Sequence, residues 1–112
     1  MNIQIYFGKK NFDTQKAERY FKERRIPFQG LDLKKHRLGE REVRLMLEKI
    51  GMEEILDRDD SKVREHPACY YDRAELLIPA IQENPWLLKT PIVRNGNLVT
   101  SGYQPDVWDQ WK

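Results

Sequence analysis

A strand, a helix and a second strand follow one another in the first third of the chain. Residues 2–7 alternate polar and apolar side chains, which is the pattern of a half-buried strand. Residues 12–25 have helical periodicity, and Pro27 prevents the helix from continuing because proline lacks an amide hydrogen and restricts the residue before it. Residues 28–33 are predicted to form the next strand. A crossover helix between two strands makes them parallel neighbours in one sheet.

Two positions are suitable for capping this first helix. The side chain of either Asn11 or Asp13 can accept hydrogen bonds from the unpaired amides of the first turn. The inward face of the helix is predicted to contain Ala17, Tyr20 and Phe21.

The middle of the chain is predicted to be helical and its end to form a hairpin. Two groups of apolar residues have the i, i+3, i+4, i+7 spacing of amphipathic helices. They are Val43, Met46, Leu47 and Ile50, ending at Gly51, and Ala74, Leu77, Ile78 and Ile81, ending near Asn84-Pro85. Asn95-Gly96 between two apolar runs predicts a hairpin turn. A short amphipathic helix with Val107, Trp108 and Trp111 is expected to close the chain.

The order is therefore strand–helix–strand, a helical insert over about residues 35–88, a hairpin and a final helix. Two parallel strands and a hairpin predict an α/β thioredoxin-like fold with a four-stranded mixed sheet. The length of 112 residues suits one domain over residues 1–112. Trp108 and Trp111 are expected in the core, although an exposed interaction patch is the alternative.

The charge is distributed unevenly along the chain. Residues 1–50 hold 13 Lys and Arg against 7 Asp and Glu, whereas residues 51–112 hold 7 against 11. A basic half can attract an acidic protein or nucleic acid, and a solvated helix face is the simpler interpretation. No apolar run is long enough for a membrane helix, and the first residues lack the layout of a signal peptide. A cytoplasmic protein is expected.

Cys69 is the one cysteine of the chain. A single thiol excludes an internal disulfide, a Cys-x-x-Cys pair and a cysteine-based zinc site. The two histidines, His36 and His66, suggest no ligand pair, so no metal is expected. His66 stands three residues before Cys69, which leaves a nucleophilic thiol conceivable; an inert, partly buried thiol is the favoured interpretation.

Three segments together resemble one family. Thr14-Gln15-Lys16-Ala17 follows the first strand, Ile26-Pro27-Phe28 leads to Asp32-Leu33, and Asn84-Pro85 leads through Thr90-Pro91-Ile92-Val93 and Asn95-Gly96 to Gly102-Tyr103. In this order and spacing they are similar to the arsenate reductase (ArsC/Spx) branch of the thioredoxin superfamily, over nearly the whole chain. The resemblance implies that Pro91 forms a cis peptide bond beside the loop that precedes the first helix.

The family's catalytic residues are missing from the matching positions. In the family a nucleophilic cysteine stands before the first helix, where free amides and the helix dipole lower its pKa. The resemblance puts Asn11 at this position and Thr14 at that of the second cysteine of Spx-like members. Thr90 stands where reductases have an oxyanion-binding arginine, and Asp57 where they have another, with Arg58 as a possible substitute. No catalytic residue is therefore expected.

The resemblance implies a non-catalytic regulatory or protein-binding module that has lost its redox cysteines. RNA polymerase is the partner that Spx-like relatives suggest, and the basic half suits an acidic protein. The alternative is an arsenate reductase-like or glutaredoxin-like oxidoreductase that uses an external thiol such as glutathione; no other cofactor is expected. Nucleic-acid binding ranks last. Lys9, Lys10, Asn11 and Lys16 surround the start of the first helix and are candidates for binding a small anion or an acidic peptide, although solvated lysines beside a loop are the favoured interpretation. The candidate ligand-binding residues are Asn11, Phe12, Asp13, Thr14, Lys16, Arg58, Thr90 and Pro91.

Overall fold

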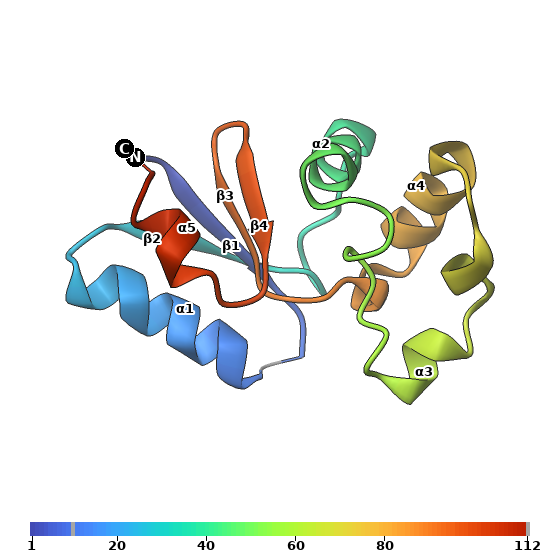
Figure 1. Ribbon diagram of the computed structural model, residues 1–112, viewed down its shortest axis with the longest axis horizontal. Coiled ribbons are helices and arrows are strands. Elements are labelled where there is room, and N and C mark those ends of the chain that lie inside the picture. The colour runs from blue at the N-terminus through green and yellow to red at the C-terminus, as the bar shows by residue number, and fades with distance from the viewer. Residues whose placement is uncertain (10, 112) are drawn as a thin grey trace.

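Four strands form one mixed sheet in the order β2-β1-β3-β4 (Figure 1). β1 (Ile3–Phe7) lies parallel to β2 (Phe28–Asp32) and antiparallel to β3 (Ile92–Asn95), which pairs with β4 (Leu98–Ser101). The computed structural model describes residues 1–9 and 11–111. It confirms the α/β thioredoxin-like fold with a four-stranded mixed sheet.

The first helix, α1 (Phe12–Glu23), begins at the cap Asn11 and ends two residues earlier than predicted. The amide of Ile26 donates to the carbonyl oxygen of Phe21 at 2.9 Å, and that of Arg25 donates to Lys22 at 3.1 Å. This pair of bonds is the Schellman motif, which requires a left-handed residue after the helix. Arg25 has that conformation, with φ 57°. The motif ends the helix before the proline is reached.

The insert contains three helices and two short 3₁₀ turns. They are α2 (Glu40–Ile50), α3 (Ser61–Arg64), η1 (Pro67–Tyr70), α4 (Ala74–Glu83) and η2 (Pro85–Leu87). α2 ends at Gly51, as predicted, and Gly51 adopts a positive φ of 96° that favours glycine. Among the described residues, no helix has the length and apolar character needed to cross a bilayer.

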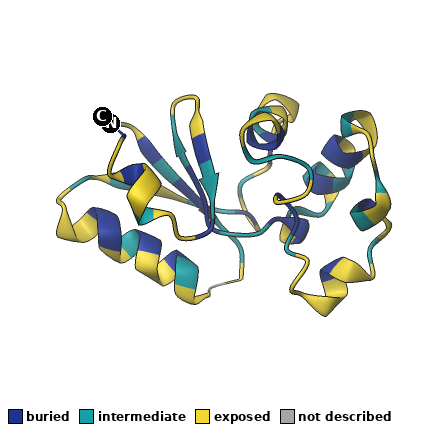
Figure 2. Cartoon of the chain, viewed as in Figure 1, coloured by how far each residue is buried: buried dark blue, intermediate teal, exposed yellow. Residues whose placement is uncertain are grey.

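The sheet separates two hydrophobic cores (Figures 1 and 2). Ile3, Ile5 and Val93 pack with α1 and the tryptophans of the C-terminal segment. Tyr6 and Ile92 point to the opposite face, because neighbouring residues of a strand alternate in direction. There they pack with the buried faces of α2 and α4.

The hairpin and the last helix differ in detail from expectation. Asn95 pairs with Leu98, so the two-residue turn is Gly96-Asn97 rather than Asn95-Gly96. Gly96 has φ 61° at the first turn position, where a type II′ turn needs glycine. The last helix, α5 (Pro105–Trp108), has only one turn. Trp108 and Trp111 are 2% and 7% exposed and thus belong to the core.

Candidate functional site

Asn11 connects the start of α1 to the segment before β3. Its Oδ1 accepts a hydrogen bond from the amide of Thr14 at 2.7 Å, which makes Asn11 the helix cap. Its Nδ2 lies 3.1 Å from the carbonyl oxygen of Thr90 and 3.4 Å from the Thr90 hydroxyl. Both ends of the amide are therefore engaged. The Thr90-Pro91 peptide bond is cis, as the resemblance predicted.

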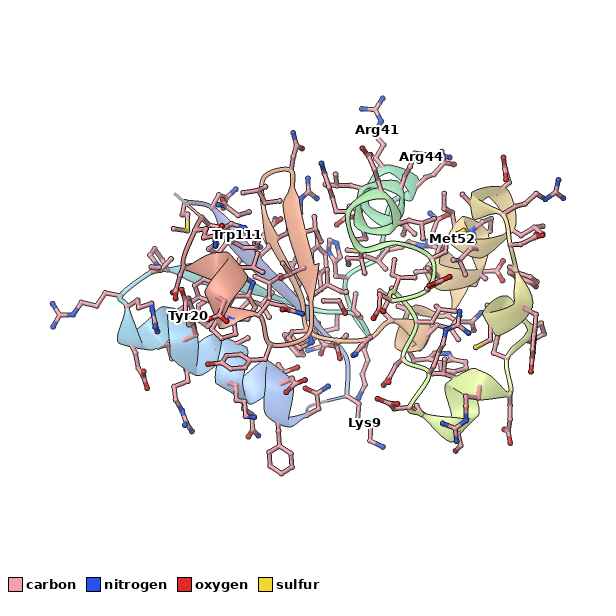
Figure 3. All side chains as sticks on the ribbon, viewed as in Figure 1. Lys9, Tyr20, Arg41, Arg44, Met52 and Trp111 are labelled. Carbon is pink, nitrogen blue, oxygen red and sulfur yellow. The ribbon has the colours of Figure 1, made fainter. Side chains whose placement is uncertain are left out.

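Two hollows adjoin this contact. One has a volume of about 360 Å³, and its lining includes Asn11, Thr90 and Trp86, the carboxylates of Asp57 and Asp60, and the cations Lys9 and Lys62. The other, of about 250 Å³, shares Asn11, Thr90 and Asp57 and extends over the start of α1. Figure 3 shows Lys9 between the part formed by the sheet and α1 and the part that contains α3.

Carboxylates surround the smaller hollow. Asp13, Asp57 and Asp59 line it, against one cation, Lys89. Burial, together with the charges of Asp60 and Asp59, raises the pKa of the Asp57 carboxyl above its ordinary value, although a backbone hydrogen bond opposes the shift. A hollow with this charge repels an oxyanion. The position that the family resemblance assigns to an arginine therefore carries the opposite charge.

The remaining candidates of the first helix are only partly gathered here. Phe12 lies on the rim of the smaller hollow and is 80% exposed. Thr14 is buried, and its hydroxyl has no hydrogen-bond partner among the residues that the structure describes. Lys16 places its Nζ 5.7 Å from the centre of the Tyr103 ring, outside both hollows. Lys10 lies outside the described residues.

Arg58 does not take the place that the sequence suggested for it. Its Nη1 donates to the carbonyl oxygen of Cys69 at 3.2 Å, and its Nε donates to that of Glu53 at 3.4 Å. It lines neither hollow beside Asn11. The guanidinium therefore connects two parts of the insert, at Glu53 and Cys69.

Cys69 is partly buried, and its Sγ donates to the carbonyl oxygen of Val63 at 3.1 Å. His66 is not its base, because His66 Nδ1 accepts from the amide of Ala68 at 3.0 Å. This geometry favours the inert thiol. Among the described residues there is no cluster of three or more metal-ligating side chains.

Sequence reasoning missed a group of hydrogen-bonded polar residues around Glu42 of α2. Glu42 accepts from the Tyr6 hydroxyl at 2.7 Å, lies 3.0 Å from His36 Nε2 and accepts from the amide of Gly39 at 2.9 Å. Burial acts to raise the pKa of Glu42, but the bonds from Gly39, His36 and Tyr6 outweigh it and lower that pKa. Burial, followed by the bond to Glu42, raises the pKa of Tyr6 to about 12. Helical periodicity placed Glu42 on α2 but gave no sign of these partners.

Comparisons with known proteins agree with this fold. The model of the ArsC family matches residues 6–111. The solved structure of the YFFB protein is similar with a TM-score of 0.81 at 22% identity, covering 96% of each chain. An arsenate reductase (ArsC) related protein from Brucella melitensis has a TM-score of 0.69 at 24% identity, covering 99% of this chain and 94% of that one. An arsenate reductase from Vibrio cholerae has a TM-score of 0.80 at 16% identity, with coverage of 96% and 94%. No curated protein matches the chain.

Proposed function

Since this chain belongs to the ArsC family, with the family model matching residues 6–111, we propose that it is a member without redox catalysis that works by binding a partner protein. The observation that carries the proposal is Asn11, held at both ends at the position where the resemblance expects the nucleophile. Its Oδ1 caps α1 and its Nδ2 binds the Thr90 carbonyl. A carboxamide is not a useful nucleophile.

The charge around Asn11 supports the same conclusion. Arsenate is an anion that arginine side chains bind in pairs of hydrogen bonds. Here Asp13, Asp57 and Asp59 adjoin Asn11 and Thr90, and Arg58 is bound to the carbonyls of Glu53 and Cys69. These contacts support the proposal that the family's nucleophile and oxyanion site are both lost while the fold is kept.

The direct test is turnover by the purified protein with arsenate, glutathione and a glutaredoxin. We expect no reduction of arsenate above the rate without protein. Sustained thiol-dependent turnover would overturn the proposal.

A second test separates the lost thiol from the lost anion site. In a Cys69→Ser background, Asn11→Cys supplies a single thiol at the N-terminus of α1, where the helix dipole lowers its pKa. We expect iodoacetamide to alkylate this thiol at a lower pH than it does Cys69 in the unaltered protein. We expect arsenate turnover to remain absent because the carboxylates remain. Turnover by this double variant would show that the anion site is still present.

A second candidate function is an oxidoreductase that uses an external thiol such as glutathione. The hollow of about 360 Å³ beside Thr90, whose lining includes Lys9 and Lys62, is the observation that favours it. A titration with glutathione, arsenate and phosphate, followed by the amide resonances of residues 11–16 and of Thr90, discriminates between the two. Shifts confined to those amides favour the second candidate, and unchanged resonances favour the binding module.

A further inference from the structure

A further hollow shares Lys9 with the hollow of about 360 Å³ beside Asn11. It has a volume of about 590 Å³ and runs between the turn after β2 and the end of α4. Lys34, Lys35 and Arg37 form one wall, and Pro85 and Trp86 form part of the other. Its lining includes the buried side chains of Leu33 and Leu38. We call this hollow the basic groove.

The walls of the basic groove are fixed by hydrogen bonds. Asp32 accepts from the amide of Lys34 at 2.9 Å through its side chain, and from the amide of His36 at 2.7 Å through its carbonyl oxygen. Gln82 Nε2 donates to the carbonyl oxygen of Leu38 at 3.2 Å, which ties the turn to α4. The backbone that carries the cations is therefore ordered before any ligand arrives, which reduces the entropy lost on binding.

The charge of the basic groove is strongly one-sided. Lys9, Lys34, Lys35 and Arg37 are exposed, and none of them has an ion-pair partner among residues 1–9 and 11–111. Glu83 is the one carboxylate in the lining. Unpaired cations around an apolar floor attract an anionic ligand that also has an apolar part.

The basic groove continues into the hollow beside Asn11. The two share Gly8, Lys9, Pro85 and Trp86 in their linings. Trp86 is 40% exposed at this junction, and the Lys62 ammonium lies 4.8 Å from the centre of its ring. Trp86 therefore offers exposed aromatic surface for an apolar side chain at this junction. Asp57 and Asp60 line the hollow beside Asn11, so the carboxylates of an acidic occupant are confined to the basic groove and only its apolar part reaches Trp86.

We propose that the basic groove binds an extended acidic segment of a partner protein. Carboxylates of the segment pair with Lys34, Lys35 and Arg37, and an apolar side chain packs against Trp86. This inference rests on the proposed binding function and names the surface and the partner's chemistry.

Tryptophan fluorescence tests the inference. The other two tryptophans, Trp108 and Trp111, are buried in the core on the opposite face of the sheet, so a ligand in the groove perturbs Trp86. The probe is a ten-residue synthetic peptide of glutamates with a terminal leucine, and its control has glutamines instead. We expect saturable binding of the acidic peptide that weakens as salt is added, with no response to the control peptide.

Charge reversal locates the binding surface. The variant Lys34→Glu/Lys35→Glu/Arg37→Glu is compared with Arg19→Glu/Lys22→Glu/Arg41→Glu, which changes the net charge equally at exposed positions outside the groove. Figure 3 shows Arg41 on α2, far from Lys9. We expect the groove variant to bind the peptide at least about tenfold more weakly and the control variant to change binding by less than about twofold. Circular dichroism of both variants checks that they are folded.

Three results would overturn the inference: equal weakening in both variants, no change in Trp86 emission, or tighter binding of inorganic phosphate or duplex DNA than of the peptide. Any of them would leave the proposed function in place, with its partner bound elsewhere. Conversely, arsenate turnover would overturn the proposed function regardless of what the groove binds, so the two failures are distinguishable.

Discussion

Asn11 performs two structural tasks that can be separated by substitution. Asn11→Ala removes both the cap of α1 and the bond to Thr90, and we expect it to lower the free energy of unfolding by about 1–2 kcal/mol. Asn11→Asp keeps an acceptor for the Thr14 amide but loses the donor to Thr90. Urea unfolding should therefore place Asn11→Asp between the wild type and Asn11→Ala. Equal stability of all three proteins would contradict this division.

Glu42 gives the protein a sensitivity to acid. Its pKa is lowered in the folded state, so it stabilises the fold above its ordinary pKa, and this contribution is lost as the pH falls through the folded value. We expect Glu42→Gln to lower the free energy of unfolding by about 1–2 kcal/mol at pH 7 and by progressively less at acid pH, below the ordinary pKa of the carboxyl. Glu48→Gln, on the exposed face of the same helix, should change stability little at either pH. A constant penalty for Glu42→Gln at both pH values would exclude the titration as its cause.

The end of α1 carries an avoidable strain. Arg25 occupies a left-handed conformation with φ 57°, which glycine adopts without the steric cost that a Cβ brings. We expect Arg25→Gly to raise the free energy of unfolding by about 1 kcal/mol, measured by urea unfolding. Lys22→Gly, one turn earlier within the helix, should lower it by about 1 kcal/mol. A loss of stability in Arg25→Gly would show that the contacts of the Arg25 side chain stabilise the fold by more than the left-handed backbone conformation destabilises it.

Helices and strands could be predicted from the sequence where residue periodicity and local turn residues determine them. Alternating residues in β1, helical spacing in α2 and Gly51 were sufficient for these elements. The early end of α1 was missed because an arginine, rather than glycine, occupies the left-handed position. The hairpin turn was predicted one residue too early. Residues 95–97 are Asn-Gly-Asn, and both Asn-Gly and Gly-Asn are typical two-residue turns.

The candidate site could be predicted only in part, for a physical reason. Asn11 and Thr90 are 79 residues apart, and only the family resemblance suggested that they meet. No resemblance indicated the basic groove, whose walls come from residues 33–38 and 82–86. Side-chain direction also lies beyond sequence pattern, as Arg58 shows by turning toward the carbonyls of Glu53 and Cys69.

The whole molecule has one buried tyrosine in each of its two cores. Tyr6 packs with α2 and α4, and Tyr20 packs with α5 and donates to Asp109. Burial, followed by the carboxylate partner, raises the pKa of each hydroxyl to about 12. This contribution to stability is complete below the ordinary pKa of about 10 and is lost as the pH rises through the folded value.

Alkaline titration should therefore show a late ionisation that belongs to Tyr6 and Tyr20. We expect both to ionise together with unfolding, above the ordinary tyrosine pKa of about 10, as followed by absorbance at 295 nm and by circular dichroism. Tyr20→Phe should remove one tyrosine from this late ionisation. Ionisation of Tyr6 or Tyr20 near pH 10 with the fold intact would contradict the assignment.

Because the sheet separates the two cores, a ligand in the basic groove should stabilise one core and not the other. Leu33 and Leu38, which line the groove, belong to the core under α2 and α4 and not to the one under α1. The binding free energy of a segment stabilises conformations in which the core under α2 and α4 is intact. Amide hydrogens of α2 and α4 would then exchange with solvent more slowly, while those of α1 would keep their rates wherever the halves open separately. One face of the protein would respond to its partner while the other remains as it was.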